Sequence, residues 1–156
     1  MNILDYLDED SVALNIRPKS KKTIISSVLD FLIEKNKIDK DDKKHVLKSI
    51  IQREDMGSTA IGGGVAFPHA RLDSVKDVLI CVAISPEGVD FDSLDQEPVF
   101  VIALLLSNQK EAGLHLKMLA FLARMLRDKY LLQKLKSAKS SQEVLTILKN
   151  QQQAIF

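Results

Sequence analysis

Apolar residues recur in the first third of the chain at the three- and four-residue spacing of amphipathic helices. The first stripe predicts a helix from a cap at Ser20 to about Asn36, and the second predicts one from a cap at Asp39 to about Arg53. The alternation in residues 12–16 predicts a short strand before both. The stripes consist of Ile25, Val28, Leu29 and Leu32, and of Val46, Leu47, Ile50 and Ile51.

The middle of the chain changes from helical spacing to extended patterns. Val65–Phe67 suits a short strand, and Pro68 restricts the residue before it to extended geometry, so a loop is expected to begin at His69. Two uninterrupted apolar runs, Val78–Ile84 and Val99–Leu106, predict central strands that are covered on both faces.

The last third returns to helical spacing. Helices are expected over residues 114–126 and 129–135, and from a cap at Ser141 to about Lys149, followed by a loose tail over residues 150–156. Helices, then strands, then helices indicate one α/β domain whose sheet is sandwiched between helices.

The balance of 22 basic and 21 acidic residues gives a net charge of +1, which provides no global attraction to nucleic acid or an anionic membrane. Aromatic residues make up only 5% and Trp is absent, so nucleic-acid binding is not expected. No signal peptide opens the chain, and no apolar run approaches the roughly 20 residues that span a bilayer. The single cysteine, Cys81, is expected to be a buried, inert thiol, which fits a cytoplasmic setting.

The sequence lacks the motifs of metal-binding proteins, of serine hydrolases and of P-loop nucleotide-binding proteins. The three histidines, at positions 45, 69 and 115, have no metal-binding spacing, and no Gly-x-Ser-x-Gly elbow or P-loop is present. The sequence therefore predicts no metal and no organic cofactor.

His69 has the clearest chemical context, because it follows Pro68 and the glycine-rich segment 57–64. A neutral imidazole can attack phosphorus directly, and basic or hydroxyl side chains can then bind the phosphoryl oxygens. A loop histidine satisfied by a backbone carbonyl is the alternative interpretation. The candidate phosphate-binding residues are Arg53, Ser58, Thr59 and Arg71, with His115 on a later helix.

Residues 53–70, REDMGSTAIGGGVAFPHA, closely resemble the phosphorylation-site signature of the fructose/mannitol/nitrogen class of enzyme IIA domains. Residues 91–99 and 115–120 resemble two further segments of that family, and the likeness covers residues 12–149. The resemblance implies one enzyme IIA domain over residues 1–156, with a mixed β-sheet flanked by helices on both faces and the phosphoacceptor at the sheet edge.

The resemblance also implies roles for single residues. His69 matches the histidine that is phosphorylated on Nε2, and His115 matches the second histidine, which hydrogen-bonds the phosphoryl oxygens. Arg53 matches the arginine that neutralises the phosphate, and Thr59 matches a threonine that serves as a hydroxyl donor or orienter. The pair Ala70–Arg71 departs from the commoner Gly-Lys, so Arg71 can contact phosphate or a partner differently.

The activity implied is that of a phosphotransferase component, in which a histidine phosphocarrier protein donates to His69 and phospho-His69 donates onward. The chain is then a regulatory protein of the nitrogen-type branch, a sugar-transport component that serves a IIB domain, or a non-catalytic binding module. The stretch Arg53–Thr59 resembles the nitrogen-type branch more, and no IIB or membrane domain is attached to these residues, which favours the regulatory role with target proteins as partners.

Overall fold

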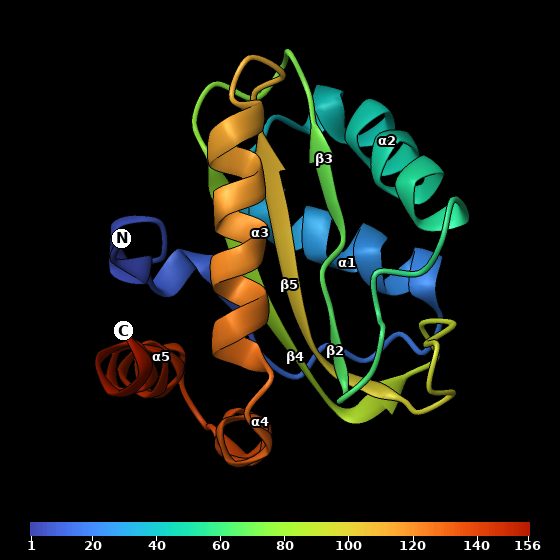
Figure 1. Ribbon diagram of the computed structural model, residues 1–156. Helices are drawn as coiled ribbons and strands as arrows, with labels where there is room; N and C mark the ends of the chain where they lie inside the picture. Colours follow the sequence, from blue (N-terminus) through green and yellow to red (C-terminus); the bar gives the residue numbers. More distant parts are fainter.

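The computed structural model of the protein describes residues 1–156, and it contains a five-stranded sheet between two layers of helices (Figure 1). The strands are β1 (Val12–Ala13), β2 (Val65–Ala66), β3 (His69–Arg71), β4 (Leu79–Val89) and β5 (Val99–Ser107). The α-helices are α1 (Lys21–Glu34), α2 (Lys43–Asp55), α3 (Ala112–Leu126), α4 (Lys129–Ser137) and α5 (Ser141–Ile155). Three short 3₁₀ helices complete the chain: η1 (Ile3–Asp5), η2 (Glu9–Ser11) and η3 (Lys40–Asp42).

The sheet is mixed, as predicted. The two long strands β4 and β5 pair antiparallel at its centre, and β1 adds to β4 in parallel. Both β2 and β3 pair with β5 in parallel along the opposite edge, separated only by Phe67 and Pro68. The prediction of a loop beginning at His69 is therefore wrong. Pro68 only interrupts the ladder, because its carbonyl still accepts a hydrogen bond from the Leu105 N–H and His69 comes into register with Leu105.

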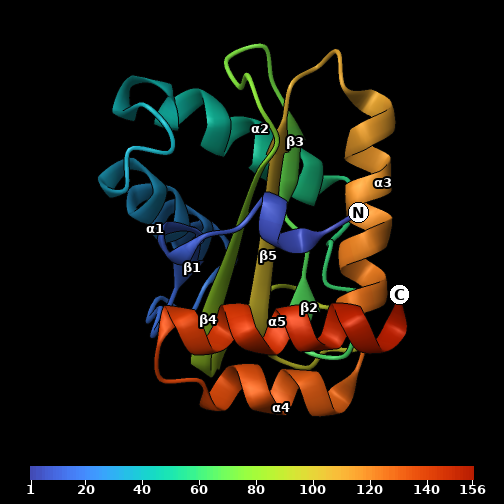
Figure 2. The same cartoon turned by 90° about the vertical axis from the view of Figure 1, so that its left-hand side faces the viewer.

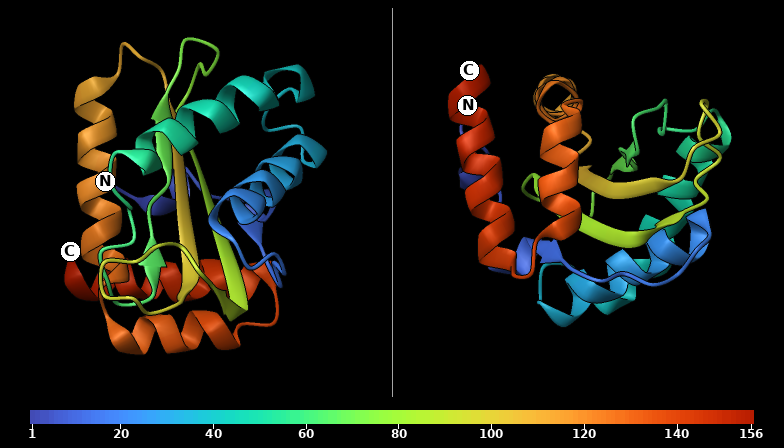
Figure 3. Two further views of the ribbon diagram at one scale, coloured as in Figure 1. Left: turned by 90° about the vertical axis from the view of Figure 1, so that its right-hand side faces the viewer. Right: turned by 90° about the horizontal axis from the view of Figure 1, so that it is seen from below.

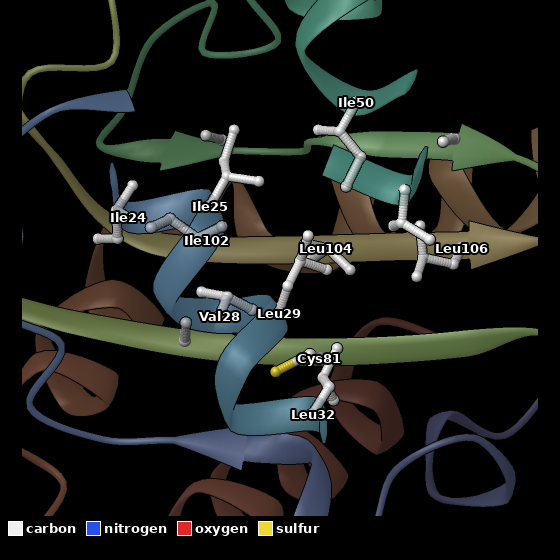
Figure 4. Packing of buried hydrophobic residues seen from close by; sticks show 14 of the residues in the cluster. Ile24, Ile25, Val28, Leu29, Leu32, Ile50, Cys81, Ile102, Leu104 and Leu106 are labelled. Atoms are coloured by element: carbon white, nitrogen blue, oxygen red, sulfur yellow. The ribbon is translucent and has the colours of Figure 1, made fainter. Parts of the chain in front are cut away.

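Both faces of the central strands are buried, which confirms the interpretation of the two apolar runs. Helices α1 and α2 cover one face, and α3, α4 and α5 cover the other, as seen from below in Figure 3. Figure 4 shows the first of these layers, where Leu29 and Leu32 of α1 pack over Cys81 and Leu104. Cys81 is fully buried, and burial raises the pKa of its thiol to about 12, so the expected inert cysteine is confirmed.

Two strands differ in length from the prediction. β1 stops at Ala13 because Asn15 adopts a left-handed conformation with φ of 55°. β4 extends to Val89, beyond the end of the predicted run at Ile84, because the strand continues through an irregularity in which the register shifts between Ile84 and Val89. Gly88 supplies the positive φ of 87° that this irregularity requires.

Helix caps explain the other differences. Asp39 caps η3, so α2 begins later than expected, and the cap of α5 is Ser140 instead of Ser141. The prediction of a loose tail over residues 150–156 is also wrong, since α5 continues to Ile155 and the Phe156 ring stacks on Phe121.

The two termini lie side by side (Figure 2). The Ile3 N–H donates a hydrogen bond to the Gln152 side chain, which ties η1 to α5. No helix of the chain is both long and apolar enough to cross a bilayer.

Candidate functional site

His69 begins β3, which runs between α2 and α3 (Figure 1). Its Nδ1 lies 2.8 Å from the carbonyl oxygen of Phe67. A carbonyl can only accept, so the Nδ1 proton is donated in this hydrogen bond and Nε2 is left with a free lone pair. Partial burial, together with the nearby Arg53 charge, lowers the pKa of His69, against the opposing effects of the Phe67 carbonyl and Glu54. His69 is therefore a neutral imidazole with a nucleophilic Nε2 at neutral pH.

His115 lies in the first turn of α3 and faces His69 with 5.2 Å between ring centroids. Its side chain is buried, and Nδ1 lies 2.5 Å from the Ser107 hydroxyl at the end of β5. Burial, followed by the charges of His69 and Arg71, lowers the pKa of His115 to about 4. A neutral ring whose Nδ1 is already bonded keeps only Nε2 for a further hydrogen bond.

A cavity of about 430 Å³ lies between α2, β3 and the start of α3. Arg53 and Arg71 line it together with the two histidines, and no Asp or Glu side chain does. Arg53 is held in place because its Nη1 donates to the Gly57 carbonyl at 2.8 Å. An excess of donors and positive charge suits a small anion. The remaining lining residues are Ser49, Gln52, Ala70, Gln109, Ala112, Leu116 and Leu119.

The α3 helix begins at Ala112 beside this cavity, so the unpaired N–H groups of its first turn add positive potential there. The glycine-rich segment 57–64 does not supply such groups to the cavity. None of its glycines lines the cavity, and the Gly63 N–H donates to Asp95 instead.

Thr59 and Ser58 lie outside the cavity. The Thr59 hydroxyl lies 2.5 Å from the Glu54 carboxylate and accepts a hydrogen bond from the Phe67 N–H at 3.2 Å. Of the two roles suggested by the resemblance, this geometry fits an orienter of the strand that carries His69. The Ser58 hydroxyl donates to the Phe91 carbonyl.

The third histidine, His45, is exposed on α2 and takes no part in the site. No three His, Cys, Asp or Glu side chains of the chain are grouped so that they could hold a metal ion.

Sequence reasoning missed two residues that support the site, Glu54 and Ser107. Glu54 carries an ionisable side chain, yet it is only 2% exposed. It follows Val46 and Ile50 at four-residue spacing, which places it on the buried face of α2 and could have revealed it. No comparable pattern marks Ser107, whose contact with His115 depends on how α3 packs on the sheet.

Comparisons with known proteins identify a matching family model and similar proteins in several organisms. The model of the family described as "Phosphoenolpyruvate-dependent sugar phosphotransferase system, EIIA 2" matches residues 5–151. The chain is 30% identical over 148 residues to the nitrogen regulatory protein of Bradyrhizobium diazoefficiens, covering 95% of each. It is 31% identical over 137 residues to the fructose-specific EIIA component of Haloferax volcanii, covering 88% of each.

The fold is similarly close to a solved relative. The crystal structure of the nitrogen regulatory protein IIA-Ntr from Neisseria meningitidis superposes with a TM-score of 0.84 at 31% identity. The match covers 94% of this chain and 98% of that one.

Proposed function

The chain belongs to the EIIA 2 family of the phosphoenolpyruvate-dependent sugar phosphotransferase system, and on this basis we propose that it is a phosphocarrier that uses His69. In this proposal a histidine phosphocarrier protein donates a phosphoryl group to Nε2 of His69, and phospho-His69 later passes the group to an acceptor. The observation that carries the proposal is the neutral His69 ring, with Nδ1 bonded and Nε2 free, in a cavity lined by two arginines.

The transfer balances without a further reactant. The Nε2 lone pair of His69 forms the new P–N bond while the P–N bond of the donor breaks. The donor imidazole, protonated on its other nitrogen, leaves as a neutral ring. His69 keeps its Nδ1 proton and gains positive charge, which strengthens the existing hydrogen bond to the Phe67 carbonyl.

The charges of the cavity suit the product of this step. A phosphoryl group brings about −1.5 to −2 charges. Arg53 and Arg71 offset that charge, and we assign His115 as the third donor. We assign the Ser107 hydroxyl as the donor to Nδ1 of His115, which keeps the proton of His115 on Nε2, from which it can reach a phosphoryl oxygen.

Apolar side chains beside the cavity provide a surface for the donor protein. Leu116 lines the cavity and is 68% exposed, and Met56, at the end of α2 next to the Arg53 turn, is 83% exposed. Exposed apolar side chains around a charged centre are typical of transient docking sites.

We propose the regulatory role, in which the phosphorylation state of His69 determines which target proteins bind. The Arg53–Thr59 stretch and the similarity to two nitrogen regulatory proteins support it. The fructose-specific relative, which has nearly the same identity, supports the transport alternative, in which a IIB domain accepts the group.

Phosphorylation by enzyme I, a histidine phosphocarrier protein and phosphoenolpyruvate tests the carrier role. Wild type should gain one phosphoryl group and His69→Gln none, whereas the control His45→Gln should behave like wild type because His45 is exposed and does not line the cavity. An unmodified wild type would support the non-catalytic module instead.

The choice of acceptor needs a second experiment. Pull-downs with unphosphorylated wild type, phosphorylated wild type and His69→Gln should recover different proteins if the role is regulatory. Fast transfer from phospho-His69 to a sugar-specific IIB domain of the same organism, with identical pull-downs for both forms, would decide for transport.

A further inference from the structure

Glu54 is a buried carboxylate directly below the candidate site. It is 2% exposed and lies near the end of α2, where its two oxygens accept hydrogen bonds from the Thr59 N–H at 3.1 Å and the Thr59 hydroxyl at 2.5 Å. The Nζ of Lys21 lies 3.2 Å from Oε1 of Glu54 and 3.4 Å from Oδ2 of Asp92. Burying a carboxylate costs free energy unless such partners are present. The presence of the buried Glu54 carboxylate next to the site therefore suggests that it has a role there.

The hydrogen bonds of Glu54 continue to His69. Because the carboxylate can only accept, the Thr59 hydroxyl must donate its one proton to it. The lone pairs of that hydroxyl are then available for the Phe67 N–H, at 3.2 Å. The carbonyl of Phe67 in turn accepts the Nδ1 proton of His69. Each hydrogen bond in this series can therefore run in only one direction.

We propose that Glu54 is a positioning residue that acts through Thr59 to hold the Phe67 backbone, so that His69 keeps its proton on Nδ1 and presents Nε2. We call the series Glu54, Thr59, Phe67 and His69 the tautomer relay. It builds on the proposed function, since the free Nε2 matters because it is the phosphoacceptor.

The negative charge of Glu54 also supports its assignment as a positioning residue for His69. Glu54 and Arg53 are neighbours on α2 with opposite effects on His69, because the carboxylate raises the pKa of His69 while the guanidinium lowers it. When the ring of His69 becomes positive during transfer, the negative charge of Glu54 favours that state, and its hydrogen-bond series ends at the Nδ1 proton. Arg53 lies on the cavity side, where the phosphoryl oxygens arrive.

A purely structural role for Glu54 would stabilise the end of α2 without influencing the His69 proton. The two roles differ in the variant Thr59→Val, which keeps the shape of the side chain and the Glu54–Lys21 ion pair but removes the hydroxyl. Glu54→Gln is the second variant, because an amide group facing Thr59 donates where the carboxylate accepts. Thr59→Ser restores the hydroxyl, and Val144→Ala destabilises α5 on the far side of the sheet without touching the relay.

Nitrogen NMR of histidine-labelled, unphosphorylated protein at neutral pH measures the tautomer ratio of His69. We expect Thr59→Val and Glu54→Gln to shift the ratio toward the Nε2–H form by about fivefold, which corresponds to about 1 kcal/mol of hydrogen bonding. Thr59→Ser and Val144→Ala should keep the wild-type ratio. The two shifted variants should also accept phosphate about tenfold more slowly.

An unchanged ratio in Thr59→Val and Glu54→Gln, or in whichever of the two folds, would overturn the relay. The measurement needs no phosphoryl donor, so it is separate from the proposed function. A wild type that is never phosphorylated would remove the function and leave the ratio as measured.

Discussion

The rings of His69 and His115 lie with their centroids 5.2 Å apart and their planes inclined by 60°. In a partly buried cavity that also holds Arg53 and Arg71, a proton on one ring disfavours a proton on the other. A phosphoryl group on His69 would replace that repulsion by attraction, because a dianion would then lie beside His115. The pair can therefore respond to phosphorylation by a change in proton binding.

We expect the pKa of His115 to rise when His69 is phosphorylated. In the unphosphorylated protein it should lie near 4, since burial and the neighbouring positive charges oppose protonation. Titration of the histidine ring resonances by NMR in both forms measures the change. The ring resonances of the exposed His45, which lies outside the cavity, are the internal reference. Identical titration of His115 in the two forms would contradict its assignment as a phosphoryl donor.

Replacement of His115 by Ala should slow phosphoryl transfer about a hundredfold and leave the fold intact, because a donor to developing charge is lost. Ser107→Ala should give a smaller loss, since the ring remains but its proton is no longer directed to Nε2. Rapid-quench rates in both directions provide the measurement. Wild-type rates in a folded His115→Ala protein would show that the ring is only a packing residue.

Stability should fall as the pH is lowered from about 6.5 to about 4. In this window the unfolded chain protonates His115 while the folded chain, with its pKa lowered to about 4, does not, so protons favour unfolding. The loss is on the order of 3 kcal/mol at most, and the lowered pKa of His69 acts in the same direction. The pKa of Asp8 is lowered by its hydrogen bond to Lys37 and that of Asp128 by the Tyr130 N–H, so the stability that these carboxylates contribute is lost mainly at lower pH than this window.

Urea unfolding of the unphosphorylated protein at a series of pH values checks this slope. His115→Gln should remove most of it, because the side chain then no longer titrates. An equally steep slope in His115→Gln would place its origin elsewhere.

Arg53→Gln should slow phosphorylation of His69 by roughly tenfold to a hundredfold, because the cavity loses a positive charge that is already held in position by the Gly57 carbonyl. Arg71→Gln should have a smaller effect, since this side chain is exposed at the end of β3 and its charge is screened by water. Arg127→Gln, which changes an exposed arginine outside the cavity, is the matched control. Equal rates for Arg53→Gln and Arg127→Gln would exclude a role in phosphate binding.

Much of the fold could be predicted because its central elements depend on local patterns. The runs at residues 78–84 and 99–106 became β4 and β5, and their unbroken apolar character reflects burial on two faces. β3 was missed because its pairing with β5 is a long-range contact, and the local signal from Pro68 indicated a loop. The last turns of α5 were missed for a similar reason, since their packing against η1 and α3 is tertiary.

The site was only partly predictable. His69, His115 and Arg53 could be named from the family signature, and the structure brings them to one cavity. The four-residue spacing from Val46 and Ile50 marks Glu54 as a buried position, but its contact with Thr59 depends on the turn after α2. The contact of Ser107 with His115 depends on the placement of α3, which no spacing in the sequence specifies.

The most direct test of the account is the position of the phosphoryl group on the protein. Histidine-labelled protein, phosphorylated by enzyme I and the phosphocarrier, can be examined by NMR for coupling between phosphorus and a ring nitrogen. We expect one coupled nitrogen, Nε2 of His69, with the Nδ1 proton retained. Coupling at Nδ1 of His69, or at any nitrogen of His115 or His45, would contradict it.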